Sequence, residues 1–198
     1  MSLIASQEKI PLDPATQRLL ENELRPGESL LWQSAPIARR HWMATLPILL
    51  FAIPWTAFAI FWMTMAARGS AVFALFGLPF VGIGLAMLSA PWWAARMARR
   101  TGYALTTDRA LILTPAPWGG GVSVRGFAPD ELTSVERVQR SDGSGDLILA
   151  REWVRGSKGR MSEKKTGFIG VPAVQAVQLR LDELVRAHRA LRELTPEG

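Results

Sequence analysis

The sequence predicts an α+β protein: a transmembrane hairpin of two helices, and a small antiparallel β-barrel or sandwich that one C-terminal helix caps. Three observations predict this class. Residues 42–95 carry one charged side chain, Arg68, in 54 positions, whereas the other 144 residues carry 39 charges. From residue 101, short apolar runs alternate with turn residues. From residue 172, apolar residues recur at helical spacing. The predicted domains are therefore an N-terminal segment, 1–41, a membrane hairpin, 42–95, and a soluble domain, 101–194.

The N-terminal segment contains two predicted elements. Asp13-Pro14 is typical of a helix start, because Asp caps the first amides and Pro fits the first turn. Pro26-Gly27 ends this short amphipathic helix. Residues 30–34 then form a short predicted strand that stops before Pro36.

The membrane hairpin is predicted from two uncharged runs, 42–67 and 69–95, each longer than the roughly 20 residues that cross a bilayer as a helix. Backbone amides in lipid must be satisfied internally, so runs joined by so short a turn read as paired helices. Arginines crowd both ends of the hairpin, and only Arg68 lies in its turn. The positive-inside bias therefore predicts a multi-pass membrane protein with both termini in the cytoplasm. The flanking arginines are Arg39, Arg40, Arg96, Arg99 and Arg100.

Aromatic and small residues refine the hairpin. Trp42 at its entry and Trp92 and Trp93 at its exit suit the headgroup layer. Neither run contains Asp, Glu, Lys or His, the usual markers of an ion or proton path. Pro54 and the glycines of the second run are better explained by helix packing than by transport. Lipid is therefore the expected surrounding of both helices.

The soluble domain is predicted to contain six short strands and one helix. Asp142-Gly-Ser-Gly-Asp146 reads as a hairpin turn, because arginines occupy two of the positions that a calcium loop needs as ligands. Gly119-Gly-Gly121 lacks the Lys-Ser/Thr of a phosphate loop and reads as a turn. The predicted strands are 103–107, 110–114, 122–125, 132–138, 147–154 and 166–171. The apolar stripe of the final helix consists of Val174, Val177, Leu181, Leu184, His188 and Leu191.

The order of these features resembles the bacterial membrane proteins that carry a pleckstrin-homology-like domain. The resemblance is carried by Tyr103-Ala-Leu-Thr-Thr-Asp-Arg109, Gly143-Ser-Gly-Asp-Leu-Ile148 and Gly167-Phe-Ile-Gly-Val-Pro172 after a membrane hairpin. It implies a bent antiparallel sheet of seven strands with a C-terminal helix. Because only six strands follow the hairpin, we expect Leu30–Ser34 to supply the seventh, with the hairpin inserted between it and Tyr103. In the wider pleckstrin-homology fold, basic residues in the loop after the first strand hold phosphoinositides. If residues 103–107 are the first strand here, that loop is only Asp108-Arg109, and if Leu30–Ser34 is, the loop is the whole membrane hairpin. Neither loop suits such a pocket.

Catalytic chemistry is not expected. The chain has no Cys and only two histidines, His41 and His188, and neither has partners at metal-ligand spacing. The sequence therefore predicts no enzyme activity and no metal or cofactor.

The most prominent polar feature is basic. Between residues 151 and 165 there are six positive and two negative side chains. A cytoplasmic loop of this charge near the bilayer would be attracted to anionic lipid headgroups, although an ordinary solvated loop explains it equally well. Nucleic acid is not an expected partner, because no aromatic stacking platform accompanies the charges. The loop residues are candidate membrane-surface contacts, in addition to the flanking Arg and Trp residues. They are Arg155, Lys158, Arg160, Lys164 and Lys165.

The predicted function is a non-enzymatic scaffold at the inner membrane whose cytoplasmic domain binds a protein partner, a second copy of the chain or the lipid surface. The alternative is a small accessory subunit of a membrane enzyme or transporter complex. In that case Gly77, Gly82 and Gly84 would form a packing face for other helices.

Overall fold

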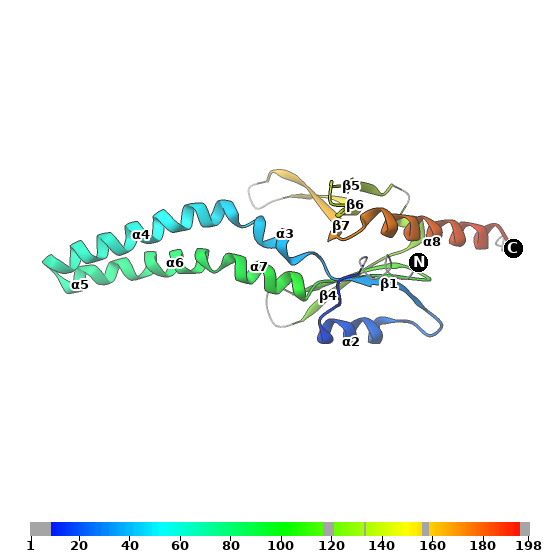
Figure 1. The fold of residues 1–198 in the computed structure, drawn as a ribbon, viewed down its shortest axis with the longest axis horizontal. Coiled ribbons are helices and arrows are strands. Elements are labelled where there is room, and N and C mark those ends of the chain that lie inside the picture. The colour runs from blue at the N-terminus through cyan, green and yellow to red at the C-terminus, as the bar shows by residue number, and fades with distance from the viewer. Residues whose placement is uncertain (1–8, 117–120, 133, 156–158, 195–198) are drawn as a thin grey trace. The chain divides into compact units, whose positions relative to one another are not determined.

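The protein was analysed as a computed structural model that describes residues 9–116, 121–132, 134–155 and 159–194, with the side chains of residues 40–42 left out. Figure 1 follows the chain from the N-terminal helix through the long helices to the strands and the C-terminal helix. The chain forms two compact units. We call Ala38–Arg96 the hairpin unit, and Met1–Ile37 together with Met97–Gly198 the sheet unit.

The hairpin unit contains two helical stretches long and apolar enough to cross a membrane, Leu46–Gly69 and Ala71–Leu88. Their side chains are mostly exposed. Each long stretch is shorter than the uncharged run that predicted it. Prolines near helix starts account for this at two of the ends, because Pro47 favours the start of the first stretch and Pro91 the start of a separate helix after Leu88. The helices are α3 (Ala38–Met43), α4 (Leu46–Gly69), α5 (Ala71–Ala74), the 3₁₀ turn η1 (Leu75–Gly77), α6 (Leu78–Leu88) and α7 (Ala90–Arg99), whose last residues belong to the sheet unit.

Small residues make the contact between α4 and α6. A side chain at Gly84 would overlap the Thr56 hydroxyl, and one at Gly77 would overlap Met63. A side chain at Gly82 would meet nothing within 4 Å. Two of the three glycines considered as a face for other helices therefore serve the hairpin itself.

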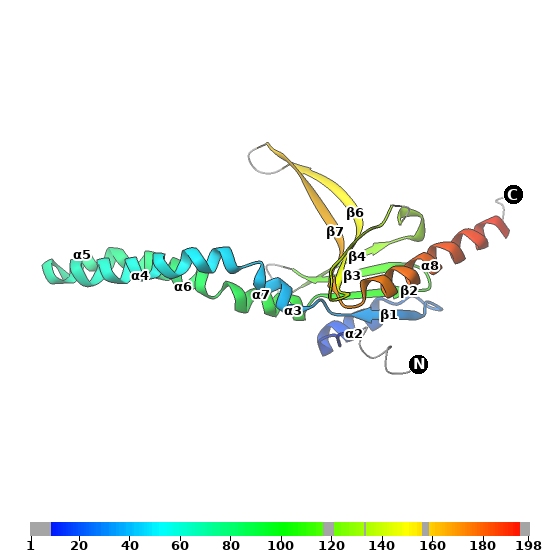
Figure 2. The same ribbon diagram turned by 45° about the horizontal axis from the view of Figure 1, so that its top comes forward.

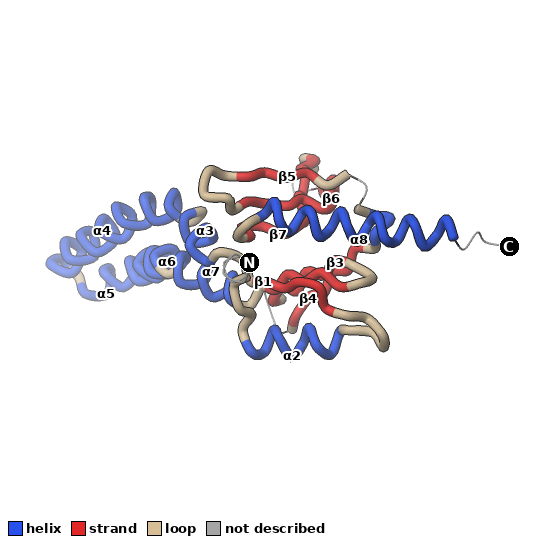
Figure 3. Tube along the Cα trace, turned by 45° about the vertical axis from the view of Figure 1, so that its right-hand side comes forward, coloured by secondary structure: helices blue, strands red, loops and turns tan. Residues whose placement is uncertain are grey.

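The first sheet of the sheet unit has the strand order β1-β2-β3-β4, all antiparallel. Its first strand comes from before the hairpin: Trp32 pairs with Leu105, and Ser34 pairs with Tyr103. The prediction that Leu30–Ser34 pairs with the strands after the hairpin is confirmed. The seven strands form two sheets, however, and not the single bent sheet that the resemblance implies. Figure 3 shows β1 beside the strands that follow the hairpin. The strands are β1 (Leu30–Ser34), β2 (Gly102–Thr106), β3 (Ala110–Pro115) and β4 (Val122–Phe127).

The second sheet has the order β5-β6-β7, and two of its boundaries differ from the prediction. A strand was expected from residue 132, but a 3₁₀ turn, η2 (Pro129–Glu131), precedes the buried Leu132 and β5 covers only Glu136–Gln139. The last strand was expected from Thr166, but β7 runs over Met161–Val171 opposite β6, Gly145–Arg155. Most of the segment taken as a basic loop is therefore strand, since charged residues can pair across two strands whose faces are both solvated.

A helix covers each side of the first sheet. Helix α2 (Pro14–Glu23) places Leu20 against Ala104, Leu111 and Leu113 on one face. Helix α8 (Val174–Leu194) inserts its apolar stripe into the main core, where it meets residues of both sheets such as Trp32 and Phe168. Strand β2 is buried along its whole length because both its faces are covered. The core thus lies between two sheets under α8; no closed barrel is present in the described residues, so the barrel form of the prediction is wrong.

Candidate functional site

The predicted membrane-surface residues of α7 and its surroundings are exposed. Trp92 and Trp93 lie edge to face with their ring centroids 4.9 Å apart, and the Arg96 guanidinium lies 5.6 Å from the Trp92 ring centroid. A cation over an aromatic face is an attractive contact. Arg39, Arg99 and Arg100 are also exposed. The side chains of Arg40 and Trp42, and all of Lys158, lie outside the described residues.

The remaining candidates belong to a two-stranded extension of the second sheet, which we call the β6–β7 arm: residues 151–155 of β6 paired with residues 161–165 of β7. At the base of the same strands, Leu147, Leu149 and Phe168 are core residues. Figure 2 shows the two strands leaving the rest of the unit as a narrow ribbon. The arm therefore has solvent on both of its faces.

Strand register divides the arm into two faces. Arg151 pairs with Lys165, Trp153 with Glu163, and Arg155 with Met161. Because successive side chains of a strand point to opposite faces, these six side chains share one face. The opposite face carries Glu152, Val154, Ser162 and Lys164. Three large apolar side chains of the arm are exposed: Trp153 (67%), Val154 (39%) and Met161 (52%).

The carboxylates of the arm are already occupied. Glu163 accepts a hydrogen bond from Arg151 at 2.8 Å, and Arg151 also contacts Glu136 of β5. Glu152 lies 3.1 Å from Arg125 of β4, which joins the arm to the first sheet. Within the described part of the chain, no carboxylate lies within ion-pair distance of the other cations of this region. They are Arg155, Arg160, Lys164 and Lys165.

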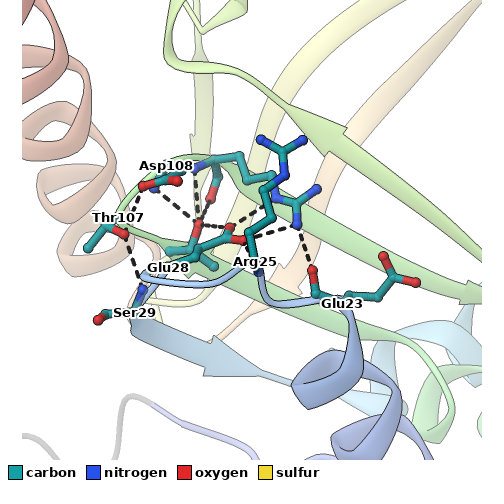
Figure 4. Close-up of polar contacts among 8 residues, drawn as sticks. Glu23, Arg25, Glu28, Ser29, Thr107 and Asp108 are labelled. Carbon is teal, nitrogen blue, oxygen red and sulfur yellow. Dashed lines mark hydrogen bonds and ion pairs between the residues drawn. The ribbon is translucent and has the colours of Figure 1, made fainter.

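The polar motif that carried the family resemblance has a structural role that sequence reasoning missed (Figure 4). The side chain of Glu28, which is fully covered, accepts hydrogen bonds from Arg109 Nε at 2.9 Å, Arg109 Nη2 at 3.1 Å and Thr106 Oγ1 at 2.6 Å. The Arg25 N–H donates a further bond at 2.8 Å. Arg109 also donates to the carbonyl oxygen of Glu23 at 2.7 Å. This cluster joins the loop after α2 to the β2–β3 turn.

The cluster changes the acidity of Glu28. Burial by itself raises the pKa of this carboxyl group, but the hydrogen bonds from Arg109, Thr106 and the Arg25 N–H outweigh it, and the pKa falls from 4.5 to about 2. A carboxylate this acidic stays charged at neutral pH and serves as a fixed structural anchor. The sequence gives two weak signals for this ion pair: a Glu just before a predicted strand and an Arg in a predicted hairpin turn.

Tyr103, the first residue of the same motif, is also structural. Its ring lies 5.0 Å from Phe168, and its hydroxyl donates a hydrogen bond to the Ile169 carbonyl at 3.2 Å. Burial raises its pKa to about 12. The phenol is therefore neutral at ordinary pH and ties the two sheets together.

Helix α8 provides a second surface. Leu184, Ala187 and Leu191, together with Leu31 of β1, line an open groove of about 490 Å³. Leu191 is 64% exposed, so the predicted apolar stripe extends beyond the core that covers its first half. His188, the polar member of the stripe, lies 3.6 Å from Asp130. Among the residues described, no three His, Asp or Glu side chains gather closely enough to hold a metal ion.

The chain was compared with known proteins at three levels. No family model, no curated protein and no solved structure matches it. The assignment of function therefore depends on the geometry of the arm, the two sheets and the hairpin.

Proposed function

We propose that this chain is a non-enzymatic inner-membrane protein whose two long helices anchor a cytoplasmic, pleckstrin-homology-like interaction domain. The domain acts as a scaffold that binds a protein partner, a second copy of the chain or the lipid surface. The anchor holds it beside the bilayer from both ends of the hairpin, which raises its effective concentration there.

One observation carries the proposal: β1 and β2 are neighbouring strands of one sheet, yet the two apolar helices lie between them in the chain. A single sheet cannot have its strands on both sides of a bilayer. If the hairpin spans the membrane, both of its flanks must therefore lie on one side. The excess of arginine at these flanks favours the cytoplasmic side.

The arrangement of the sheet unit supports the pleckstrin-homology-like part of the proposal. It combines seven antiparallel strands with a C-terminal helix, as the resemblance implies, although the strands form two sheets and not one. Thr106 and Arg109 of the motif organise the β2–β3 turn, and the Arg109 guanidinium is paired with Glu28 and so is not free to bind a headgroup phosphate. Interaction through a surface is therefore favoured over a phosphoinositide pocket.

Site-specific labelling tests the topology. The chain has no Cys, so single Cys residues can be introduced at the exposed positions Glu21, Gly69 and Arg189 and treated with a membrane-impermeant maleimide. Spheroplasts should label only Gly69→Cys, whereas inverted vesicles should label Glu21→Cys and Arg189→Cys. Labelling of positions 21 and 189 from opposite sides would remove the proposal.

Crosslinking in intact membranes tests the scaffold role. A short amine-reactive crosslinker, followed by mass spectrometry, should recover a partner, a dimer or lipid-attached protein from wild-type cells. The matched control is a chain that carries Trp32→Ala, which disrupts the core of the domain while it keeps the anchor. Equal recovery from both chains would show that the folded domain is not what binds.

A further inference from the structure

The end of the β6–β7 arm exposes apolar and cationic side chains together, and folding of the sheet unit does not use them. Trp153 and Met161 lie on one face of the arm and are each more than half exposed. Arg155 and Lys165 share that face. A two-stranded ribbon with no covering layer gains little stability from such side chains.

We propose that this face of the β6–β7 arm docks on the anionic surface of the bilayer in which the chain is anchored. The inference rests on the proposed function and names lipid as one direct contact of the domain. Trp153 and Met161 would enter the headgroup layer, and Arg155 and Lys165 would meet lipid phosphates.

Charge is the first argument for a lipid surface as the occupant. The acidic side chains of the arm are held by Arg151 and Arg125, so its free charge is positive. Anionic headgroups attract such cations strongly enough that each one favours docking about fivefold. Arg160 and Lys164 add to this field from the end and the opposite face of the arm.

The amphipathic pattern is the second argument. Trp is the residue that most favours the boundary between hydrocarbon and water, because its ring is apolar and its N–H is polar. A nucleic acid would instead require several aromatic rings for successive bases, whereas the described part of the arm has Trp153 alone.

Direction is the third argument. In Figures 1 and 2 the strands of the arm extend toward the side of the sheet unit at which β1 ends. The chain leaves the sheet unit there after Ile37 and returns at Met97. The chain segment that leads from β1 to the proposed anchor therefore leaves the sheet unit on the side toward which the arm extends.

Spin labels on adjacent residues test the contact in the full-length chain. Met161→Cys lies on the proposed docking face and Ser162→Cys on the opposite one, so a nitroxide on each reports its own face. The chains are placed in nanodiscs of phosphatidylcholine with or without about 30 mol% phosphatidylglycerol, which supplies the anionic surface. Accessibility to an aqueous nickel chelate is then measured by EPR.

We expect the label at 161 to be protected from nickel only in anionic nanodiscs, while the label at 162 stays accessible in both. Arg155→Glu with Lys165→Glu should weaken docking by far more than about 25-fold, since two attractions of about fivefold are lost and two repulsions are added. Arg137→Glu with Arg189→Glu changes the net charge equally at exposed positions elsewhere and should leave protection intact. Hydrogen exchange of β2 should be unchanged in both double variants, which excludes unfolding.

Three results would overturn the inference: equal nickel accessibility at 161 and 162 in anionic nanodiscs, protection that does not depend on lipid charge, or protection that appears only when RNA or an acidic polypeptide is added. The maleimide labelling separates this inference from the proposed function. If positions 21 and 189 are labelled from the same side of the membrane while the label at 161 remains accessible to nickel, the proposed arm contact is wrong and the proposed function still stands.

Discussion

In the hairpin unit the buried side chains that the structure describes are all small, whereas the sheet unit buries large ones as well. Ala52, Thr56 and Ala59 form the covered side of α4, while Leu50 is 77% exposed. In the sheet unit Trp32 and Phe168 are almost completely covered, with their ring centroids 5.7 Å apart. Large apolar side chains are thus exposed in one unit of the chain and buried in the other.

The proposed membrane anchor explains the difference, because water and lipid sort side chains differently. Water drives large apolar side chains into a core because the gain grows with the apolar area removed from it. Lipid provides no such drive, so helices there associate through close contact of small residues and leave large ones outside. The inverted sorting in the hairpin unit supports the proposed membrane anchor independently of the lengths of its helices.

The largest test of this comparison exchanges a large side chain for Ala in each unit. Trp32→Ala should destabilise the sheet unit by about 3–5 kcal/mol, because it opens a cavity between the two sheets. Leu50→Ala should change stability by less than about 0.5 kcal/mol, because in the proposed anchor its side chain stays in lipid in either state. Hydrogen exchange of β2 and of α4 in nanodiscs measures both.

Trp32→Phe is the matched control for that cavity, since it keeps most of the ring volume and should cost much less than Trp32→Ala. Comparable losses of stability from Trp32→Ala and Leu50→Ala would contradict this comparison, because they would show that large side chains contribute equally in both units.

A second test enlarges small residues of the hairpin. Gly84→Leu should weaken the pairing of α4 and α6 by about 1–3 kcal/mol, because the new side chain overlaps Thr56. Gly82→Leu places the same side chain where nothing lies within 4 Å and should leave the pairing unchanged. Both variants are reconstituted and unfolded with SDS, and the loss of helix content is measured by circular dichroism.

Should Gly82→Leu instead remove a protein that co-purifies with the chain, the accessory-subunit alternative would gain support. Equal effects of the two substitutions on hairpin stability would contradict the packing described for α4 and α6.

The smallest effect concerns a buried charge of the sheet unit, the Glu28 carboxylate. The folded pKa of Glu28, about 2, lies below its ordinary value of 4.5, so its ion pair stabilises the fold above pH 4.5. That stability is lost as pH falls through about 2. Glu28→Gln should cost about 1–2 kcal/mol at neutral pH after allowance for solvent screening.

The measurement is denaturant unfolding of wild type and Glu28→Gln from neutral pH to pH 2. The difference between the two chains should shrink across this interval, since protonation removes the charge that the substitution removes. A difference that does not depend on pH would show that the Glu28 carboxylate contributes by shape and not by charge.

Local patterns predicted most of the elements. The charge-free runs predicted two apolar helices, and the Asp13-Pro14 start, the strands of the first sheet and the stripe of α8 all appear where spacing placed them. These features depend on neighbours in sequence, so composition and period are sufficient to find them. Strand β7 begins five residues earlier than predicted, because residues 161–165, three of which are charged, form a ladder with β6 that no local pattern indicates.

The candidate site was predicted only in composition. Sequence reasoning selected Arg155, Lys164 and Lys165 as a basic group, but the pairing of β6 with β7 decided which of them share a face with Trp153. The same limit applies to Glu28 and Arg109, which are 81 residues apart in the chain. The sequence alone does not show which acidic residue pairs with which basic residue when the two are far apart in the chain.

The sequence by itself determined that two long segments avoid charge and that strands and a helix surround them, because hydropathy and period act along the chain. Only the tertiary structure decided that Leu30–Ser34 completes a sheet across the hairpin, which glycines the helices use, and which residues of the arm face one way. Those outcomes depend on contacts between distant segments, whose free energy is set by shape, burial and register in three dimensions.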